Sequence, residues 1–363
     1  MNSIVVRPGV KGSIHMRDMP DPKLKPDQVA VKMIRAGLCR TDAEIGDGVF
    51  GEAPKGDEYL ILGHENFGVV EEVGKKVKAF KAGDLVVATV RRPCRCFTCK
   101  AGQTDMCYAG GYKERGIVGC HGFMAEYYVE SPQWLNKIPK RLSDIAILLE
   151  PISVVEKGID HAFLIQTRLA WKPRTGLVLG AGPIGLLAAA VMRARGLDTH
   201  VIGLEPETDQ RAQLVKKLGS TYHSIANRTI LDAKTDMPPV DVAVEATGVA
   251  RAAFQGMQML GRNGVLCMLS LTGGSQTAEQ PIERINQQLV LGNQVVFGSV
   301  NANARHFAMG LADFAVIERK WPGVLKQLIT TRLPWDQYNR WFGAEASGIK
   351  TTLEISEYSK AEN

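Results

Sequence analysis

Hydrophobic and polar positions alternate in short runs through the first 150 residues. Three β-branched runs, bounded by Gly, Pro and Asp, predict strands at residues 29–35, 68–73 and 85–90. The first ten residues also have a strand-like pattern, with no apolar segment of the kind found in a signal peptide. Short strands separated by turns are typical of an antiparallel, barrel-like domain.

From about Gly176 the pattern changes to strands that alternate with helices. Helical periodicity appears at 184–195 and 208–218, and apolar runs predict strands at 177–180, 199–204, 240–246, 264–269 and 294–298. This alternation predicts a parallel, doubly wound sheet. Beyond Asn301 the pattern predicts helices at 306–317 and 323–330, and a last strand at 349–355 that returns to the first domain.

We therefore predict an α/β protein of two domains, which suits a length of 363 residues. Residues 1–155 and 303–363 form the first, β-rich domain, and residues 156–302 form the dinucleotide-binding domain.

Composition narrows the class of protein. Hydrophobic residues make up 45% and charged residues 23%, as in soluble globular proteins. The longest apolar run, 177–192, contains three glycines and a proline and does not predict a membrane span. The net charge of +6 is spread out and aromatic residues are only 7%, which argues against nucleic-acid binding. We expect a cytoplasmic protein, and a mild positive charge suits an anionic dinucleotide.

A glycine-rich turn marks the dinucleotide site. Gly180, Gly182 and Gly185 fit the pattern G-x-G-x-x-G, between a predicted strand and a predicted helix. The first glycine makes a tight turn, the second lets the pyrophosphate approach, and the third lets helix and strand pack closely. Pro183 and Ile184 complete the turn, where the helix N-terminus stabilises phosphate. The alternative is a glycine-rich turn without a ligand.

An acidic residue follows this turn at the expected distance. Glu205 comes after the second predicted strand, where a carboxylate accepts a hydrogen bond from the adenosine ribose and repels a 2′-phosphate. NAD is therefore favoured, although Arg211 on the next helix could reach the phosphate of NADP. Alternatively, Glu205 is a solvated loop carboxylate.

Three separated residues offer ligands to a catalytic metal. Cys39, His64 and Glu150 each have an ordinary structural interpretation, as a core thiol, a turn histidine and a surface carboxylate. As a set they provide thiolate, imidazole and carboxylate, which is a zinc site with a fourth position open.

A second group of cysteines is closely spaced. Of seven cysteines, four fall between positions 94 and 107, which in a reducing compartment indicates metal rather than disulfides. We predict that a structural zinc ion is bound by Cys94, Cys96, Cys99 and Cys107. Three ligands plus another group, or no metal, are the alternatives.

These motifs together resemble those of the zinc-dependent medium-chain dehydrogenases/reductases. Cys-x-Thr-Asp, Gly-His-Glu, the cysteine cluster, Glu-Pro and the glycine-rich turn occur in that family's order along essentially the whole chain. Four segments make the chain most similar to archaeal-type glucose dehydrogenases: 115–124, 150–157, 298–301 and 349–351. The resemblance implies a GroES-like catalytic domain and a Rossmann domain. The cysteine cluster departs from it, with one residue rather than two in its first gap.

The resemblance also assigns roles around the catalytic zinc. Cys39, His64 and Glu150 lie near the ion, and Glu65 is a neighbouring carboxylate that joins or leaves its shell. Zinc lowers the pKa of a substrate hydroxyl, and hydride passes to the nicotinamide. Thr41 is then the first station of a proton relay, or alternatively a helix N-cap. Many alcohol dehydrogenases have a histidine three residues later, where this chain has Glu44.

By resemblance, the substrate-facing residues are polar. Glu114, Glu150 and Asn301 face a sugar, with Thr89 and Thr41 beside them, whereas Val154 replaces a carboxylate found in relatives. His121 is a further candidate, although a loop histidine is more often structural. Thr247 and Asn301 complete the cofactor-binding set.

We therefore predict a sugar dehydrogenase that converts an aldose to its lactone, with zinc and NAD or NADP. A dehydrogenase of a polyol or secondary alcohol is the alternative, and a non-catalytic cofactor-binding protein is a distant one. Residues 286–300 end in an apolar strand that could pair across a two-fold axis, so we expect a homodimer or homotetramer.

Overall fold

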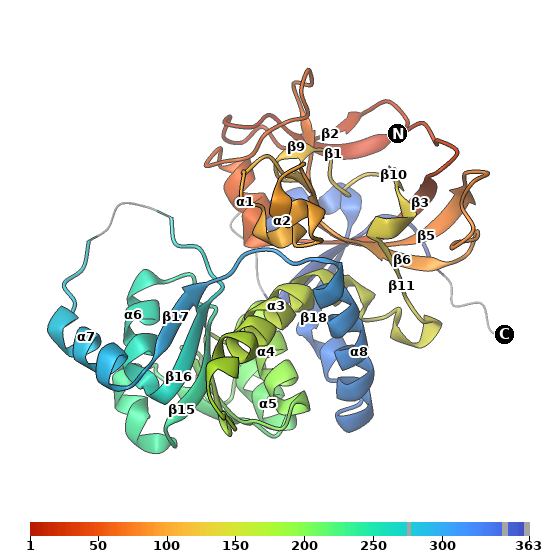
Figure 1. The fold of residues 1–363 in the computed structure, drawn as a ribbon. Coiled ribbons are helices and arrows are strands. Elements are labelled where there is room, and N and C mark those ends of the chain that lie inside the picture. Colours follow the sequence, from red (N-terminus) through yellow and green to blue (C-terminus); the bar gives the residue numbers. More distant parts are fainter. Residues whose placement is uncertain (274–276, 343–347, 359–363) are drawn as a thin grey trace. The chain divides into compact units, whose positions relative to one another are not determined.

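The computed structural model describes residues 1–273, 277–342 and 348–358. The chain divides into two compact units, whose elements are labelled in Figure 1. Unit 1 comprises Met1–Glu150, Asn301–Leu311 and Ile329–Asn363, and unit 2 comprises Pro151–Val300 and Ala312–Leu328. Among the described residues, no helix has both the length and the apolar character needed to cross a membrane.

Unit 1 is built on three sheets. The largest has the strand order β11-β6-β5-β3-β19-β18, with β10 also paired to β3. Its strands are β3 (Val29–Gly37), β5 (Glu65–Val73), β6 (Leu85–Ala88), β10 (Tyr127–Glu130), β11 (Leu135–Lys137), β18 (Ile329–Pro334) and β19 (Lys350–Glu354). The smaller sheets contain β1 (Asn2–Val6), β2 (His15–Asp18) and β4 (Leu60–Ile61), and β7 (Arg91–Arg92), β8 (Lys113–Arg115) and β9 (Gly119–Cys120).

The core of unit 1 follows from the alternation along β3 and β5. Val29, Val31 and Met33 are fully buried, because alternate residues of a strand point to the same face. The antiparallel pairing of β3 with β5 and with β19 brings the ends of distant segments together at Gly37. The strand predicted at 349–355 is confirmed as β19, and it does return to this sheet.

Short helices complete unit 1, and two longer helices run on into unit 2. The short helices are α1 (Arg40–Gly46), α2 (Phe97–Lys100) and α9 (Asn339–Phe342), and the longer ones are α3 (Leu149–Ile165) and α8 (Ala304–Lys320).

Unit 2 is a six-stranded, fully parallel sheet with the order β14-β13-β12-β15-β16-β17. This is the order of a dinucleotide-binding sheet, in which the ligand crosses between the first and fourth strands in sequence, here β12 and β15. The strands are β12 (Thr175–Leu179), β13 (Asp198–Gly203), β14 (Thr221–Ser224), β15 (Val240–Glu245), β16 (Leu260–Met268) and β17 (Val295–Gly298). The helices between them are α4 (Pro183–Ala194), α5 (Gln210–Lys217), α6 (Ala250–Met259) and α7 (Ile282–Leu291) (Figure 1).

The sequence prediction missed β14, α6 and α7, and it differs from the structure in two further details. The helix predicted at 323–330 is only a 3-10 turn at Leu325–Leu328, followed by strand β18. Thr330 and Thr331 favour the extended chain, and pairing with β19 overrides the helical pattern. The predicted domain ranges also place 312–328 outside the dinucleotide-binding part, whereas unit 2 includes them. Because α8 is one continuous helix, its pattern carries no sign of that division.

Candidate active site

Three potential metal ligands meet in unit 1. Cys39 is the N-cap of α1, His64 lies directly before β5, and Glu65 is the first residue of β5. Their ligand atoms all lie within 4.8 Å of one another. His64 and Glu65 are buried, so their polar atoms have little access to water. The structure thus brings together Cys39 and His64, which come from separate motifs.

Glu65 lies in a space that Gly37 leaves open. Gly37 pairs with Glu65 across β3 and β5, and a Cβ atom at Gly37 would lie 1.9 Å from Glu65 Oε2. Lys350 Nζ donates to Glu65 Oε1 and, at 2.9 Å, to the Leu38 carbonyl oxygen. Glu65 Oε2 has no hydrogen-bond partner among the described residues. A buried carboxylate oxygen of this kind is a place for a cation.

Asp42 supports both Cys39 and His64. Its Oδ2 accepts from the Cys39 backbone N–H at 2.9 Å, and its Oδ1 lies 3.3 Å from His64 Nδ1. Burial lowers the pKa of His64, but the charge and hydrogen bonding of Asp42, with a contribution from Cys39, raise that pKa well above its usual value. A carboxylate behind a histidine fixes the ring and strengthens it as a metal ligand.

Glu150 begins α3 and is buried, which rules out the surface-carboxylate interpretation. It lies outside the group whose ligand atoms are all within 4.8 Å. Burial raises the pKa of Glu150 to about 7, with His64 opposing the shift and Glu65 adding to it. Glu150 therefore shares the electrostatic environment of the metal-facing residues.

Thiolate, imidazole and carboxylates in one buried place fit zinc. Cys39, His64 and Glu65 offer ligand atoms, and Glu150 adds a nearby carboxylate. When bound, zinc would act as a Lewis acid that favours loss of a proton from a substrate hydroxyl.

Thr41 lies beside this group. Its Oγ1 is 3.8 Å from Cys39 Sγ, and it is the second residue of α1 rather than the N-cap, which is Cys39. Arg40 Nε donates to Glu44 Oε1 at 3.0 Å, so the carboxylate at the position of the relay histidine is engaged by a neighbour on the same helix.

Two of the residues expected to face the sugar are in contact. Glu114 is buried and not a surface charge, and its Oε1 accepts from Asn301 Nδ2 and from Arg91 Nε. The Arg91 guanidinium lies 3.8 Å from the centre of the Tyr112 ring. Asn301 itself has a left-handed backbone with φ of 61°. A carboxylate and an amide held together in this way can read several hydroxyl groups.

The other polar candidates have structural partners. The Thr89 carbonyl and hydroxyl oxygens both accept from Arg92, at 3.0 and 3.1 Å. His121 Nδ1 accepts from the Ile61 N–H at 3.2 Å, and its Nε2 lies 3.2 Å from Asp57. His121 therefore joins its own loop to strand β4 and to the segment that contains Asp57.

The four clustered cysteines come together in unit 1. The sulfur atoms of Cys94 and Cys107 are 3.4 Å apart, and those of Cys94 and Cys99, and of Cys96 and Cys107, are 3.8 Å apart. Zn–S bonds of about 2.3 Å in a tetrahedron place the sulfurs roughly 3.8 Å from one another. A hydrogen bond from Thr98 lowers the pKa of Cys96 to about 5, whereas burial raises that of Cys99 to about 12. The shortened first gap is thus compatible with four zinc ligands.

The glycine-rich turn of unit 2 has the expected geometry. Gly180 has φ of 101°, and a Cβ at Gly185 would lie 1.9 Å from the Gly180 carbonyl oxygen. Nothing lies within 4 Å of a Cβ at Gly182, which is the N-cap of α4, with Pro183 as its first residue and Ile184 next. The turn therefore leaves the helix N-terminus open to an anionic ligand.

A cavity of about 480 Å³ adjoins this turn, and Glu205 and Thr247 help to line it. Glu205 Oε2 accepts from the Tyr222 hydroxyl at 3.3 Å, and its Oε1 lies 3.6 Å from Arg211 Nε. The Thr247 hydroxyl donates to the buried Glu245 carboxylate and accepts from the Val249 N–H. Thr247 thus faces the cavity with its hydroxyl already engaged.

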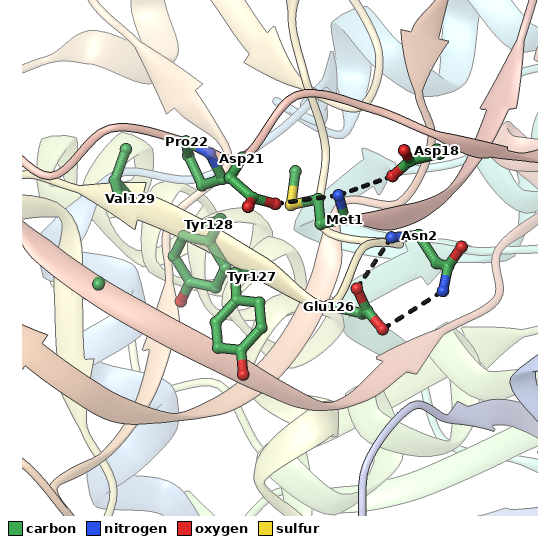
Figure 2. Close-up of a pocket in the computed structure, with 10 residues that line it drawn as sticks. Met1, Asn2, Asp18, Asp21, Pro22, Glu126, Tyr127, Tyr128 and Val129 are labelled. Atoms are coloured by element: carbon green, nitrogen blue, oxygen red, sulfur yellow. Dashed lines mark hydrogen bonds and ion pairs between the residues drawn. The ribbon is translucent and has the colours of Figure 1, made fainter.

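A second cavity, of about 540 Å³, lies elsewhere on unit 1 (Figure 2). The Met1 amine donates to Asp18 at 2.9 Å and lies 2.9 Å from Asp21, and the Asn2 N–H donates to Glu126. The acidic side chains of this cavity thus form hydrogen bonds or ion pairs with neighbouring residues. None of the residues predicted for the active site lines the cavity.

Three site residues were not singled out from the sequence: Asp42, Lys350 and Arg91. Each acts through a partner that the sequence analysis did identify, namely His64, Glu65 and Glu114. Asp42 carried a usable signal, since it stands in the Cys-x-Thr-Asp motif.

Comparisons with known proteins show which families the chain resembles. Residues 25–140 match the alcohol dehydrogenase GroES-like domain, and residues 143–355 match the glucose dehydrogenase C-terminus. Glucose 1-dehydrogenase from Methanocella arvoryzae is 43% identical over 98% of this chain and 99% of its own. Glucose 1-dehydrogenase 1 from Caldivirga maquilingensis is 42% identical over the same shares.

Solved structures of dehydrogenases have a similar fold. Glucose dehydrogenase from Haloferax mediterranei, in complex with NADP, Zn and gluconolactone, has a TM-score of 0.89 and 31% identity, covering 99% of this chain and 100% of that one. A butanediol dehydrogenase from Bacillus subtilis, 23% identical with a TM-score of 0.80 over 98% of this chain and all of its own, shares the fold.

A GroES-like part and a parallel dinucleotide-type sheet, with the thiolate–imidazole–carboxylate group, define a zinc-type medium-chain dehydrogenase/reductase. Within that class, the chain belongs to the family of archaeal-type glucose 1-dehydrogenases.

Proposed function

We propose that this protein oxidises the C1 hydroxyl of an aldose, with glucose as the first choice, to the lactone while it reduces a nicotinamide cofactor. The proposal rests on one observation. Unit 1 contains both the metal-facing group of Cys39, His64 and Glu65 and the hydrogen-bonded pair of Glu114 and Asn301. The relatives' names and the gluconolactone complex of the Haloferax mediterranei enzyme support it.

The side chains have distinct roles in this proposal. Cys39 and His64 would hold the zinc ion, with Glu150 near it and Glu65 as a carboxylate that could join or leave its shell. Thr41, beside Cys39, would take part in removing the proton of the C1 hydroxyl, and a bound nicotinamide would supply the hydride acceptor. Glu114 accepts hydrogen bonds from sugar hydroxyls, and Asn301 orients Glu114.

A substrate panel tests this proposal. We expect cofactor reduction with glucose, and with galactose or xylose more slowly, at rates that a zinc chelator lowers by about tenfold or more. Sorbitol, threonine and ethanol should be poor substrates, because the site is expected to read a ring with several hydroxyls. Turnover of the open-chain polyol or the simple alcohols alone would replace the aldose assignment with the polyol or alcohol alternative.

For the cofactor, we propose that Glu205 favours NAD. Its carboxylate can accept from the ribose hydroxyls and would repel the 2′-phosphate of NADP. Arg211, beside it, offers a phosphate partner, and the Haloferax mediterranei complex contains NADP, so NADP is the alternative.

The variant Glu205→Ala should raise the ratio of kcat/KM with NADP to that with NAD by about tenfold, because it removes the repulsion and leaves Arg211. Glu207→Ala is the matched control, since Glu207 is exposed and pairs with Lys216. A ratio that stays the same in Glu205→Ala would remove Glu205 from the ribose site.

We also propose that the four cysteines between positions 94 and 107 hold a structural zinc ion, for which their sulfur separations provide the support.

For the assembly, we propose a homodimer or homotetramer in which chains pair through β17. This strand is at the edge of its sheet, and Ile282, Val290 and Leu291 of the preceding helix are 65–73% exposed. Edge strands with exposed apolar neighbours are suited to pairing across a two-fold axis. Sedimentation equilibrium should give the mass of two or four chains, and a monomer would contradict the proposal.

A further inference from the structure

Lys157 is a buried lysine with a specific backbone partner. It lies on α3, its residue is 1% exposed, and its Nζ donates to the Val300 carbonyl oxygen at 2.9 Å, within unit 2. Lysine is almost never fully buried unless its charge is compensated. The Val300 carbonyl oxygen is one of the groups that compensate this ammonium group.

The surrounding packing brings Lys157 to the segment that follows β17. A Cβ at the next residue, Gly158, would lie 3.0 Å from Cys267 Sγ and 3.1 Å from Leu269 Cδ2, so α3 lies close to the end of β16. The Ser299 N–H donates to the Met268 carbonyl oxygen at 3.0 Å. The segment 299–300 is thus held by a backbone bond from one side and by Lys157 at its end.

The residue that follows has an unusual conformation. Asn301 has φ of 61°, which is uncommon for a residue other than glycine. The Val300 carbonyl group and the Asn301 N–H belong to one planar peptide unit. A bond to Val300 oxygen therefore fixes the plane from which the left-handed turn at Asn301 begins.

Asn301 uses this turn to contact the predicted sugar site. Its Nδ2 donates to Glu114 Oε1, and its Oδ1 accepts from the Ala302 N–H at 2.7 Å. The chain passes from unit 2 to unit 1 between Val300 and Asn301. Lys157 thus donates to Val300, and the next residue, Asn301, donates to Glu114.

We propose that Lys157 is a positioning residue for sugar recognition. It holds the Val300–Asn301 peptide so that Asn301 adopts its left-handed conformation and directs its amide to Glu114. Lys157 touches neither the sugar nor the zinc ligands in this scheme. The inference rests on the proposed aldose oxidation and names a residue that determines the geometry of that site.

A double-mutant cycle of Lys157→Met and Asn301→Ala tests the inference. Methionine keeps the length and apolar stem of lysine but cannot donate a hydrogen bond. Each single variant should lower kcat/KM for glucose by about tenfold, mostly by raising KM. A tenfold change is the size expected for the loss of one charge-assisted hydrogen bond. The double variant should lose no more than Asn301→Ala alone, because both changes remove the same contact.

Controls separate this role from a general loss of structure. Zinc content should stay within about twofold of the wild type in Lys157→Met, a range expected for sites outside the altered contact. Lys172→Met is the matched control, because Lys172 is exposed, and it should leave KM unchanged. Lys157→Gln, which retains a donor, should recover part of the lost kcat/KM.

The inference would be overturned if the fold-loss of kcat/KM in the double variant equalled the product of the two single losses. A wild-type KM in Lys157→Met would also overturn it. If the wild type oxidises a different substrate, the proposed function fails but the cycle can be measured with that substrate. A crystal structure of Lys157→Met would test the inference without any measurement of turnover. Asn301 should leave the left-handed region and lose Glu114, and an unchanged Asn301 would refute the inference.

Discussion

Replacing Cys39 with alanine is expected to reduce aldose oxidation by about a thousandfold or more, since it removes a thiolate from the catalytic zinc site. The fold should survive, because Cys39 is only partly buried and its backbone N–H can still donate to Asp42. Metal analysis should show one zinc ion per chain fewer than in the wild type.

Cys120→Ala is the control for this variant. Cys120 is also partly buried but belongs to neither cysteine-containing ligand group among the described residues. The Cys120→Ala variant should retain the zinc content and the activity of the wild type. Full turnover in Cys39→Ala would show that Cys39 does not hold a catalytic metal ion.

Replacing Cys99 with alanine is expected to have the largest effect on stability. Cys99 is the buried member of the four-cysteine group, so its loss removes a zinc ligand and leaves a gap in the lobe. Structural zinc sites contribute directly to folding free energy. We expect loss of one zinc ion and a fall in Tm of about 10 °C or more, measured by calorimetry.

The two cysteine variants should give opposite profiles. Cys99→Ala should retain most of the kcat of the wild type per correctly folded molecule at low temperature, whereas Cys39→Ala should retain stability but not turnover. An unchanged Tm and metal content in Cys99→Ala would show that the lobe holds no zinc.

Local sequence signals were sufficient for the glycine-rich turn of unit 2. The turn at Gly180 and Gly185 is set by residues a few positions apart, and the close approach of these two glycines explains why no side chain fits there. Five of the six parallel strands of unit 2 were predicted from apolar runs, whereas β14, with the polar sequence TYHS, was missed.

The supporting residues of the metal-facing group could not be found in the same way. Lys350 and Glu65 are 285 positions apart in sequence and meet only because β19 pairs with β3, beside β5. Nothing in the local pattern around Lys350 indicates a buried ion pair. Asp42 was within reach of sequence analysis, but its role depends on the orientation of His64.

Tertiary pairing also explains the error near the C-terminus. The segment 323–330 has a helical pattern, yet only Leu325–Leu328 forms a 3-10 turn before β18. The partner strand, β19, lies beyond a segment outside the described residues, so its influence was not visible in a local window.

Transfer of deuterium from glucose labelled at C1 tests the central claim most directly. The protein would be incubated with this sugar and the oxidised cofactor, and the reduced cofactor would be analysed by mass spectrometry. The account predicts that the reduced nicotinamide carries the deuterium, that gluconolactone or its hydrolysis product appears in equal amount, and that a zinc chelator stops both. Reduced cofactor without deuterium, or equal transfer after zinc removal, would contradict it.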